Sequence, residues 1–215
     1  MEVKLKVQDL SKKYDSFTAL EKVSFVLHAG EITILSGPNG SGKTTLLSCM
    51  AGIIQPTTGV VTLDGFDFIK DELEVRRRMA YVPDVPRFYL ELSAWEHLRF
   101  IAMANNAVEG FEGHAEEILK KFGLWHSRHL YPHHYSRGMQ LKLGLVFALI
   151  RPFEVLLLDE PTSALDQESV TALLDVLQQL RDRDISVLFS SHDTDLAGRI
   201  ADREMHIEQA VLMEI

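Results

Sequence analysis

One stretch of the sequence reads Gly37-Pro38-Asn39-Gly40-Ser41-Gly42-Lys43-Thr44 and matches the pattern G-x-x-x-x-G-K-[ST] at every position. Glycines let backbone N–H groups close around phosphate oxygens without a Cβ in the way. The apolar, β-branched segment Ile32–Leu35 leads into the loop as a buried strand. A helix predicted from about Lys43 points its positive end at the same charge. The stretch predicts a nucleotide-phosphate site where Lys43 neutralises the β- and γ-phosphates and Thr44 ligates Mg²⁺.

A second stretch supplies the acidic half of such a site. The four apolar residues Val155–Leu158 are followed directly by Asp159 and Glu160. We expect a buried strand that delivers Asp159 to the metal, usually through a water molecule. Glu160 can then orient and deprotonate the attacking water.

The sequence around these two stretches alternates strand and helix, except for one segment. Residues 84–151 have helical periodicity, with a Ser93–Glu96 capping box at the start of one helix. We predict an α/β domain of residues 1–83 and 152–215, with 84–151 as an all-helical insertion. The expected helices, after the one that opens at Ser93, are Phe111–Phe122, Ser136–Ile150 and Gln167–Arg183. The expected strands are Val3–Val7, Ser24–His28, Ile32–Leu35, Val60–Leu63, Met79–Val82, Val155–Leu158, Ile185–Phe189, Glu204–Ile207 and Ala210–Met213.

Composition narrows the class of protein. The 215 residues include 22 Lys plus Arg and 31 Asp plus Glu, a net charge of −9, which argues against wrapping nucleic acid. The single cysteine, Cys49, excludes a disulfide framework and a multi-cysteine zinc site. The longest uncharged stretch, Thr44–Leu63, contains Pro56 and several threonines, so we expect no membrane span. The first residues lack an apolar block, so we expect no signal peptide and a cytosolic protein.

Five further elements, in a fixed order between Tyr14 and His192, make the chain resemble the ATP-binding cassette (ABC) family. They are an aromatic residue before the phosphate loop (Tyr14), a joining loop (Tyr81-Val82-Pro83-Asp84), a signature that opens a helix (Tyr135-Ser136-Arg137-Gly138-Met139-Gln140), a D-loop (Ser163-Ala164-Leu165-Asp166) and a switch histidine (Ser191-His192-Asp193). The resemblance implies a P-loop NTPase core with a mixed sheet, an N-terminal antiparallel β part and a helical signature subdomain.

The resemblance also implies how the residues act. Two cassettes would face head to tail, each ATP lying between one phosphate loop and the partner's Ser136–Gly138 segment. Glu160, His192 and Lys43 are the expected catalytic residues, and Thr44, Asp159 and Asp84 the expected Mg²⁺ ligands. The expected nucleotide-binding residues are Tyr14, Gly37, Pro38, Asn39, Gly40, Ser41, Gly42, Lys43, Thr44, Thr45, Ser136, Gly138 and Asp166.

Two departures from the family pattern stand out. The family usually has Gln in the joining loop, and Asp84 is shorter and charged. An ionised carboxylate only accepts hydrogen bonds, so the coupling role of this loop is in doubt while nucleotide binding should survive. The signature has Arg137 in place of its first Gly, and Tyr135 and Met139 also differ, but Ser136 and Gly138 are kept. Signatures of the form Ser-x-Gly-Met resemble those of many exporter subunits.

The sequence therefore predicts an ATP-hydrolysing subunit of an ABC membrane transporter, leaning towards export. It would lie peripherally on the cytoplasmic face of the membrane, bound to a separate transmembrane permease subunit, as a homodimer or heterodimer of ATPase subunits. The alternative is a soluble ABC ATPase that acts on nucleic acid or the ribosome. A GTPase or small-molecule kinase is a third reading, which the signature and the missing Asn-Lys-x-Asp motif disfavour.

Overall fold

The computed structural model describes residues 2–192 and 198–214 of the chain. Asp193, predicted to follow the switch histidine, lies outside the described residues. The chain divides into two compact units. The first comprises 1–81, 153–160 and 177–215, and the second comprises 82–152 and 161–176. Each unit is described by itself below.

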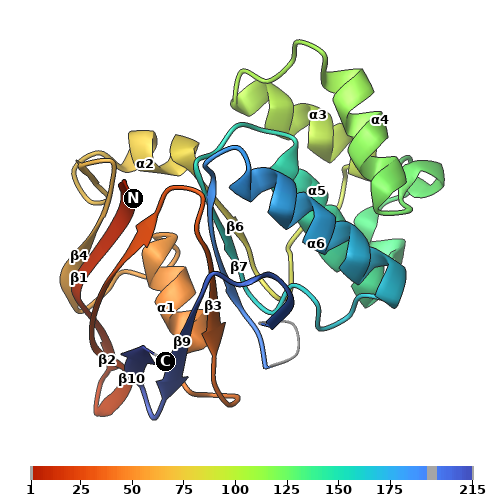
Figure 1. Ribbon diagram of the computed structural model, residues 1–215. Helices are drawn as coiled ribbons and strands as arrows, with labels where there is room; N and C mark the ends of the chain where they lie inside the picture. Colours follow the sequence, from red (N-terminus) through yellow and green to blue (C-terminus); the bar gives the residue numbers. More distant parts are fainter. Residues whose placement is uncertain (1, 193–197, 215) are drawn as a thin grey trace. The chain divides into compact units, whose positions relative to one another are not determined.

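An antiparallel sheet forms the N-terminal part of the first unit. Its strand order is β2-β1-β4-β5, and Figure 1 labels β1, β2 and β4. The long strands β1 and β2 pair along most of their length, with several register shifts. The strands are β1 (Val3–Tyr14), β2 (Phe17–His28), β4 (Thr58–Leu63) and β5 (Phe66–Asp67).

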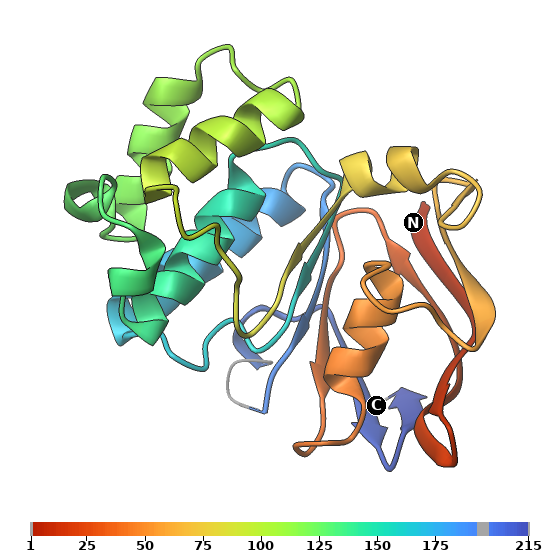
Figure 2. The ribbon, with the colours of Figure 1, turned by 180° about the vertical axis from the view of Figure 1, so that it is seen from behind.

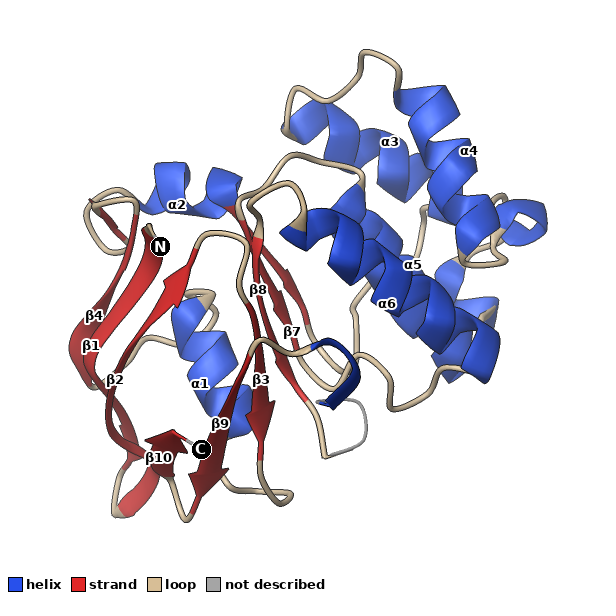
Figure 3. Ribbon diagram, in the orientation of Figure 1, coloured by secondary structure: helices blue, strands red, loops and turns tan. Residues whose placement is uncertain are grey.

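A second, six-stranded sheet has the order β10-β9-β3-β8-β7-β6. Strand β3 runs parallel to both β8 and β9, and β7 runs parallel to β8, whereas β10 is antiparallel to β9. Figure 3 draws β3, β7, β8 and β9 side by side. The strands are β3 (Ile32–Ser36), β6 (Met79–Val82), β7 (Val155–Leu158), β8 (Ser186–Ser190), β9 (Arg203–Glu208) and β10 (Val211–Glu214). The mixed sheet is therefore confirmed.

The helix α1 (Lys43–Met50) lies between the two sheets, as Figures 1 and 2 both show. Its residues Leu46, Leu47 and Met50 are fully buried and join one apolar cluster with side chains of β1, β2, β3 and β4. Burial of a leucine side chain stabilises a fold by about 1.5–3 kcal/mol, so this cluster fixes α1 firmly. A second short helix, α2 (Glu72–Arg78), precedes β6.

The second unit is helical. Helices α3 (Ala94–Ala104), α4 (Phe111–Lys121) and α5 (Arg137–Leu149) pack on one another, and Figure 2 draws them in yellow-green, green and teal. Two 3₁₀ turns, η1 (Trp125–Ser127) and η2 (Pro132–His134), lead into α5. The helix α6 (Gln167–Arg181) begins in this unit and contributes its residues 167–176 to it.

The structure extends the sequence prediction in three places. Strands β1 and β2 are longer than the segments Val3–Val7 and Ser24–His28, and β5 and α2 were not predicted. The second unit includes 161–176 in addition to the predicted insertion 84–151. Across residues 2–192 and 198–214, no helix is both long and apolar enough to cross a bilayer.

Candidate active site

The phosphate loop follows β3 directly and ends at the start of α1. Gly37 has φ 144°, and a Cβ there would lie 2.1 Å from the carbonyl oxygen of Ile207. Gly42, the N-cap of α1, has φ 116°, and a Cβ there would lie 2.8 Å from the Ala19 oxygen. Only glycine fits at these two positions, because both the backbone angle and the space exclude a side chain. The predicted order of strand, glycine loop and helix is confirmed.

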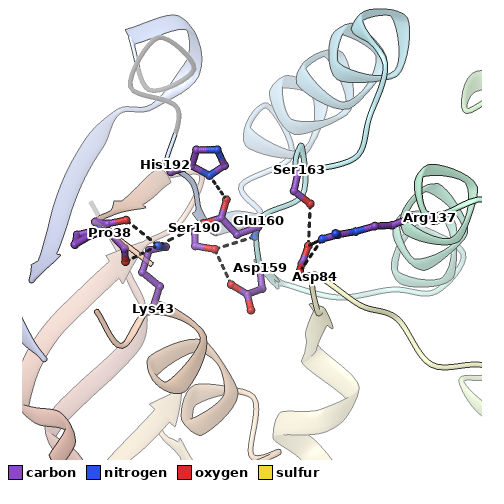
Figure 4. A network of polar contacts seen from close by, with 10 residues as sticks. Pro38, Lys43, Asp84, Arg137, Asp159, Glu160, Ser163, Ser190 and His192 are labelled. Atoms are coloured by element: carbon purple, nitrogen blue, oxygen red, sulfur yellow. Dashed lines mark hydrogen bonds and ion pairs between the residues drawn. The ribbon is translucent and has the colours of Figure 1, made fainter. Parts of the chain in front are cut away.

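Lys43 is buried in this loop, with only 6% of its side chain exposed. Its ammonium donates hydrogen bonds to the carbonyl oxygens of Gly37 at 2.8 Å and Pro38 at 3.2 Å, as drawn in Figure 4. The Glu160 Oε1 atom lies 3.4 Å from the same nitrogen. A buried ammonium is stable only when polar groups surround it, and the two carbonyl oxygens and the Glu160 carboxylate do so here. They hold the positive charge within the phosphate loop.

Glu160 links the lysine to the switch histidine. Its second oxygen, Oε2, lies 2.9 Å from Nδ1 of His192, whose ring is largely exposed. A carboxylate only accepts, so Nδ1 carries the proton and Nε2 of a neutral ring is left as an acceptor. Glu160 itself has φ 47°, in the left-handed region that a non-glycine residue adopts only when its surroundings impose it.

A residue that the sequence reasoning missed, Ser190, holds both acidic residues. Its hydroxyl accepts a hydrogen bond from the Glu160 backbone N–H at 2.8 Å and donates one to Asp159 Oδ1 at 2.7 Å. Ser190 is fully buried at the end of β8, and Asp159 is buried after β7. Because β7 and β8 are parallel neighbours, their carboxyl ends meet at one edge. The sequence offered one signal for this role: Ser190 is a small polar residue at the end of the apolar segment of β8.

The residues of this site fit a bound nucleoside triphosphate. The buried oxygens Ser41 Oγ and Glu160 Oε1 accept or donate no hydrogen bond among the residues that the structure describes. No described side chain caps the N-terminus of α1, so its first backbone N–H groups stay available to an anion. The hydroxyls of Thr44, which is exposed, and Thr45, which is half-buried, lie in this first turn.

Strands β9 and β10 support the phosphate loop from the C-terminal end of the chain. The Ala210 N–H donates to the Ser41 carbonyl oxygen at 3.1 Å, and the Ser36 hydroxyl lies 3.0 Å from His206 Nδ1. Together with the close approach of Ile207 to Gly37, these contacts fix the loop's path. The shape of the loop therefore depends on residues far along the sequence.

The signature residues lie in the second unit. Ser136 is the N-cap of α5 and accepts a hydrogen bond from the Met139 N–H at 3.3 Å, so the predicted helix start is confirmed. A Cβ on Gly138 would lie 2.6 Å from the Ala164 carbonyl oxygen. The glycine is therefore required for the close approach of α5 to the 161–166 segment.

Asp84 and Asp166 are both engaged by other side chains of the second unit. Asp84 is bound by Arg137, at 3.0 and 3.1 Å, and by the Ser163 hydroxyl at 2.8 Å. Asp166 accepts a hydrogen bond from Lys142 at 2.7 Å, which lowers the pKa of the Asp166 carboxyl well below its ordinary value. Asp166 also caps the first turn of α6 by accepting from the Ser169 N–H.

Tyr14 lies at the end of β1 with 45% of its surface exposed. The ammonium of Lys12 lies 4.6 Å from the centre of its ring. An exposed ring of this kind offers a face for stacking, and its predicted contact with adenine stays a prediction.

The predicted site residues thus form two groups. Lys43, Asp159, Glu160 and His192 meet within the first unit, around the phosphate loop. The second unit holds the other group, namely Asp84, Ser136, Gly138 and Asp166.

Comparison with known proteins identifies the family. The family model described as "ABC transporter" matches residues 20–163. The SkfA peptide export ATP-binding protein SkfE of Bacillus subtilis is 31% identical, over 98% of this chain and 87% of the relative. A solved ATP-binding subunit of an ABC transporter is 32% identical, with a TM-score of 0.91 over 99% of this chain and 90% of that chain. A dimeric post-hydrolysis state of the cassette MJ0796, bound to ADP and Pi, is 25% identical with a TM-score of 0.88 over 98% of both chains.

The chain belongs to the ABC transporter family, and the family resemblance and its fold are confirmed. It is an ATP-binding and ATP-hydrolysing cassette.

Proposed function

We propose that this cassette is the ATPase subunit of an exporter, bound to a separate transmembrane permease at the cytoplasmic face of the membrane. The observation that carries the ATPase part is the Lys43–Glu160–His192 cluster on the phosphate loop, in which one carboxylate is held between an ammonium and an imidazole. The export direction is supported by the signature Ser136-Arg137-Gly138-Met139 and by the likeness to a relative named for peptide export.

Each member of the cluster has a distinct role in hydrolysis. Glu160 orients the attacking water and accepts its proton. Its Oε1 atom lies 3.4 Å from the Lys43 ammonium but accepts no hydrogen bond from a described residue, so it can accept one from that water. His192 holds Glu160 through Nδ1 and can offer Nε2 to the water or the γ-phosphate. Lys43 offsets the negative charge that develops on the phosphate oxygens in the transition state.

Mg²⁺ is the expected metal of this site. When bound, it neutralises charge on the β- and γ-phosphates. Hydroxyl and carboxylate oxygens are the ligands it prefers, so Thr44 and Asp159 would hold it. Asp84 is the third predicted ligand, and its carboxylate is bound by Arg137 and Ser163 in this structure.

Two cassettes, identical or related, would pair head to tail around ATP. The dimeric cassette bound to ADP and Pi supports this arrangement. In the pair, Ser136 and Gly138 of one cassette would face the nucleotide held by the phosphate loop of the other. Their position at the start of α5 suits this role, because a helix N-terminus binds anions. Tyr14 and Asp166 would complete the nucleotide contacts. We expect no nucleic acid partner.

Two substitutions test the site. We expect Lys43→Ala to abolish ATP binding, because it removes the buried charge that faces the phosphates. Glu160→Gln keeps the size of the side chain but removes the base, so ATP should still bind while turnover falls about 10²–10⁴-fold. Binding and steady-state hydrolysis measured on the purified protein separate the two effects. Unimpaired turnover in Glu160→Gln would refute the assigned base.

A pull-down of the tagged protein from detergent-solubilised membranes tests the transporter role. We expect a stoichiometric membrane protein with several spans, identified by mass spectrometry. Recovery of ribosomes or nucleic-acid-bound proteins alone would instead favour a non-transport ABC ATPase. The Glu160→Gln variant, loaded with ATP, should recover the partner at least as well as the wild type.

A further inference from the structure

The carboxylate of Asp84 joins three separate segments of the second unit. Arg137, the first residue of α5, binds both of its oxygens, and Ser163 of the 161–166 segment donates to Oδ1. Figure 4 draws these three side chains with their contacts. A guanidinium that binds two carboxylate oxygens fixes direction as well as distance. Asp84 and Arg137, both named above as departures from the family pattern, therefore bind each other.

Two further contacts tie the same segments together. Gly138 lets α5 approach the Ala164 carbonyl, where a Cβ would be only 2.6 Å away. One turn further along α5, Lys142 binds Asp166 at 2.7 Å, and its own side chain is only 14% exposed. Three successive contacts therefore run from the joining loop across the start of α5 to the segment that leads into α6.

The Arg137 contact is too exposed to act mainly as a stabiliser of the fold. The side chains of Arg137 and Asp84 are 63% and 33% exposed. Ion pairs that face water contribute little to folding, because solvent screens them. Its geometry, in contrast, is specific, since two side chains from two other segments, Arg137 and Ser163, bind the one carboxylate of Asp84. Such an arrangement fits a positioning role.

We propose that Arg137 is a positioning residue for ATP hydrolysis. By binding Asp84, which also binds Ser163, it holds the 161–166 segment against the start of α5, so that Ser136 and Asp166 form one surface. This rests on the proposed pairing of two cassettes, because that surface acts on the nucleotide of the facing cassette.

The test uses Arg137→Ala, Ser163→Ala and Arg137→Lys, all of which leave Asp84 and the phosphate loop intact. Arg76→Ala is the matched control, because Arg76 forms a similarly exposed ion pair with Glu72 on α2 in the first unit. Hydrogen exchange of the Leu165 amide, which donates to Thr162 in the native segment, reports on the positioning itself. ATP-dependent dimerisation in the Glu160→Gln background reports on its consequence. Thermal unfolding checks that each variant is folded.

We expect Arg137→Ala and Ser163→Ala to speed exchange at Leu165 about two- to fivefold, the factor that an exposed ion pair contributes. Both should weaken dimerisation, Arg137→Lys should recover part of the loss, and Arg76→Ala should change neither. Unchanged exchange at Leu165, or a loss in Arg76→Ala equal to that in Arg137→Ala, would overturn the proposal. If Glu160→Gln alone forms no dimer, the pairing of cassettes is refuted, and the exchange experiment still decides the positioning role.

Discussion

The hydroxyl of Ser190 acts as the acceptor of one hydrogen bond and as the donor of another. It accepts from the backbone of Glu160 and donates to the side chain of Asp159. The first bond satisfies a backbone N–H in a residue with φ 47°, and the second orients a buried carboxylate. A single side chain thus sets both the path of the backbone that carries the base and the direction of the predicted metal ligand.

We expect Ser190→Ala to lower kcat about tenfold while KM changes less than about threefold, because a buried hydrogen bond lost on one side costs about 1–3 kcal/mol. Ser190→Thr keeps the hydroxyl and should restore most of the activity. Steady-state kinetics on both variants provides the measurement.

Ser186→Ala is the matched control for this prediction. Ser186 is equally buried on the same strand and donates to the His28 carbonyl at 2.7 Å, away from the acidic residues. It should lose comparable thermal stability but keep its kcat. Equal losses of kcat in the two variants would mean that Ser190 acts through stability alone.

At the scale of elements, α3 begins with the capping box that its sequence pattern predicted. The predicted capping box is present: Ser93 Oγ accepts from the Glu96 N–H, and the Glu96 carboxylate accepts from the Ser93 N–H at 2.8 Å. These bonds to Ser93 hold the pKa of the Glu96 carboxyl below its ordinary range. The helix start at Ala94 is thus fixed by four consecutive residues.

We expect Ser93→Ala to destabilise the protein by about 1 kcal/mol, the usual effect of losing an N-cap. Chemical denaturation measures the change. Gly113→Ala in α4 is the control with the opposite sign, because nothing lies within 4 Å of its new Cβ and alanine favours a helix by up to about 1 kcal/mol over glycine.

The same box makes a prediction about pH. A carboxyl whose pKa falls on folding contributes stability above its unfolded pKa of about 4.3, and loses it as pH falls through the folded value. The stability difference between the wild type and Glu96→Gln should therefore be constant near neutral pH and shrink in acid, below about pH 4. A difference that is the same at pH 3 and pH 7 would contradict the charged cap.

Elements whose signals are local were predictable, and elements shaped by distant pairing were not. The phosphate loop, α5 and the buried strands β7 and β8 follow from short patterns. Strands β1 and β2 extend well past their alternating segments, because they pair with each other through several register shifts, one of which spans Asp9 at positive φ. Ser190 was missed because its importance comes from the neighbouring strand β7, which lies some thirty positions away.

At the scale of the whole molecule, the reactivity of the single cysteine, Cys49, measures how often the folded core opens to solvent. Cys49 lies on α1 in the core of the first unit, 3% exposed, and burial raises the pKa of its thiol to about 11. At pH 8 only about one thiol in a thousand would be ionised. The native protein should therefore react with a maleimide far more slowly than a free cysteine does.

ATP should slow this labelling further, because a ligand that binds only the folded state stabilises it by mass action, up to about a hundredfold at a concentration 100 times its Kd. The labelling rate followed by mass spectrometry, with and without ATP, tests this. Lys43→Ala is the control in which ATP should give no protection. Fast labelling of the native protein would place Cys49 outside the core.

The support that β9 and β10 give to the phosphate loop has a consequence for biosynthesis. Ser36 and His206 are 170 positions apart, and β3 lies in the sheet between β8 and β9. While the ribosome is still making residues 37–44, neither neighbouring strand of β3 has been synthesised. The contacts that fix the path of the phosphate loop are therefore still absent. Contacts of such long sequence separation form late. A nascent chain should therefore acquire affinity for ATP only after the segment around residue 210 has emerged, so the onset of nucleotide binding would report that β9 and β10 have joined the sheet.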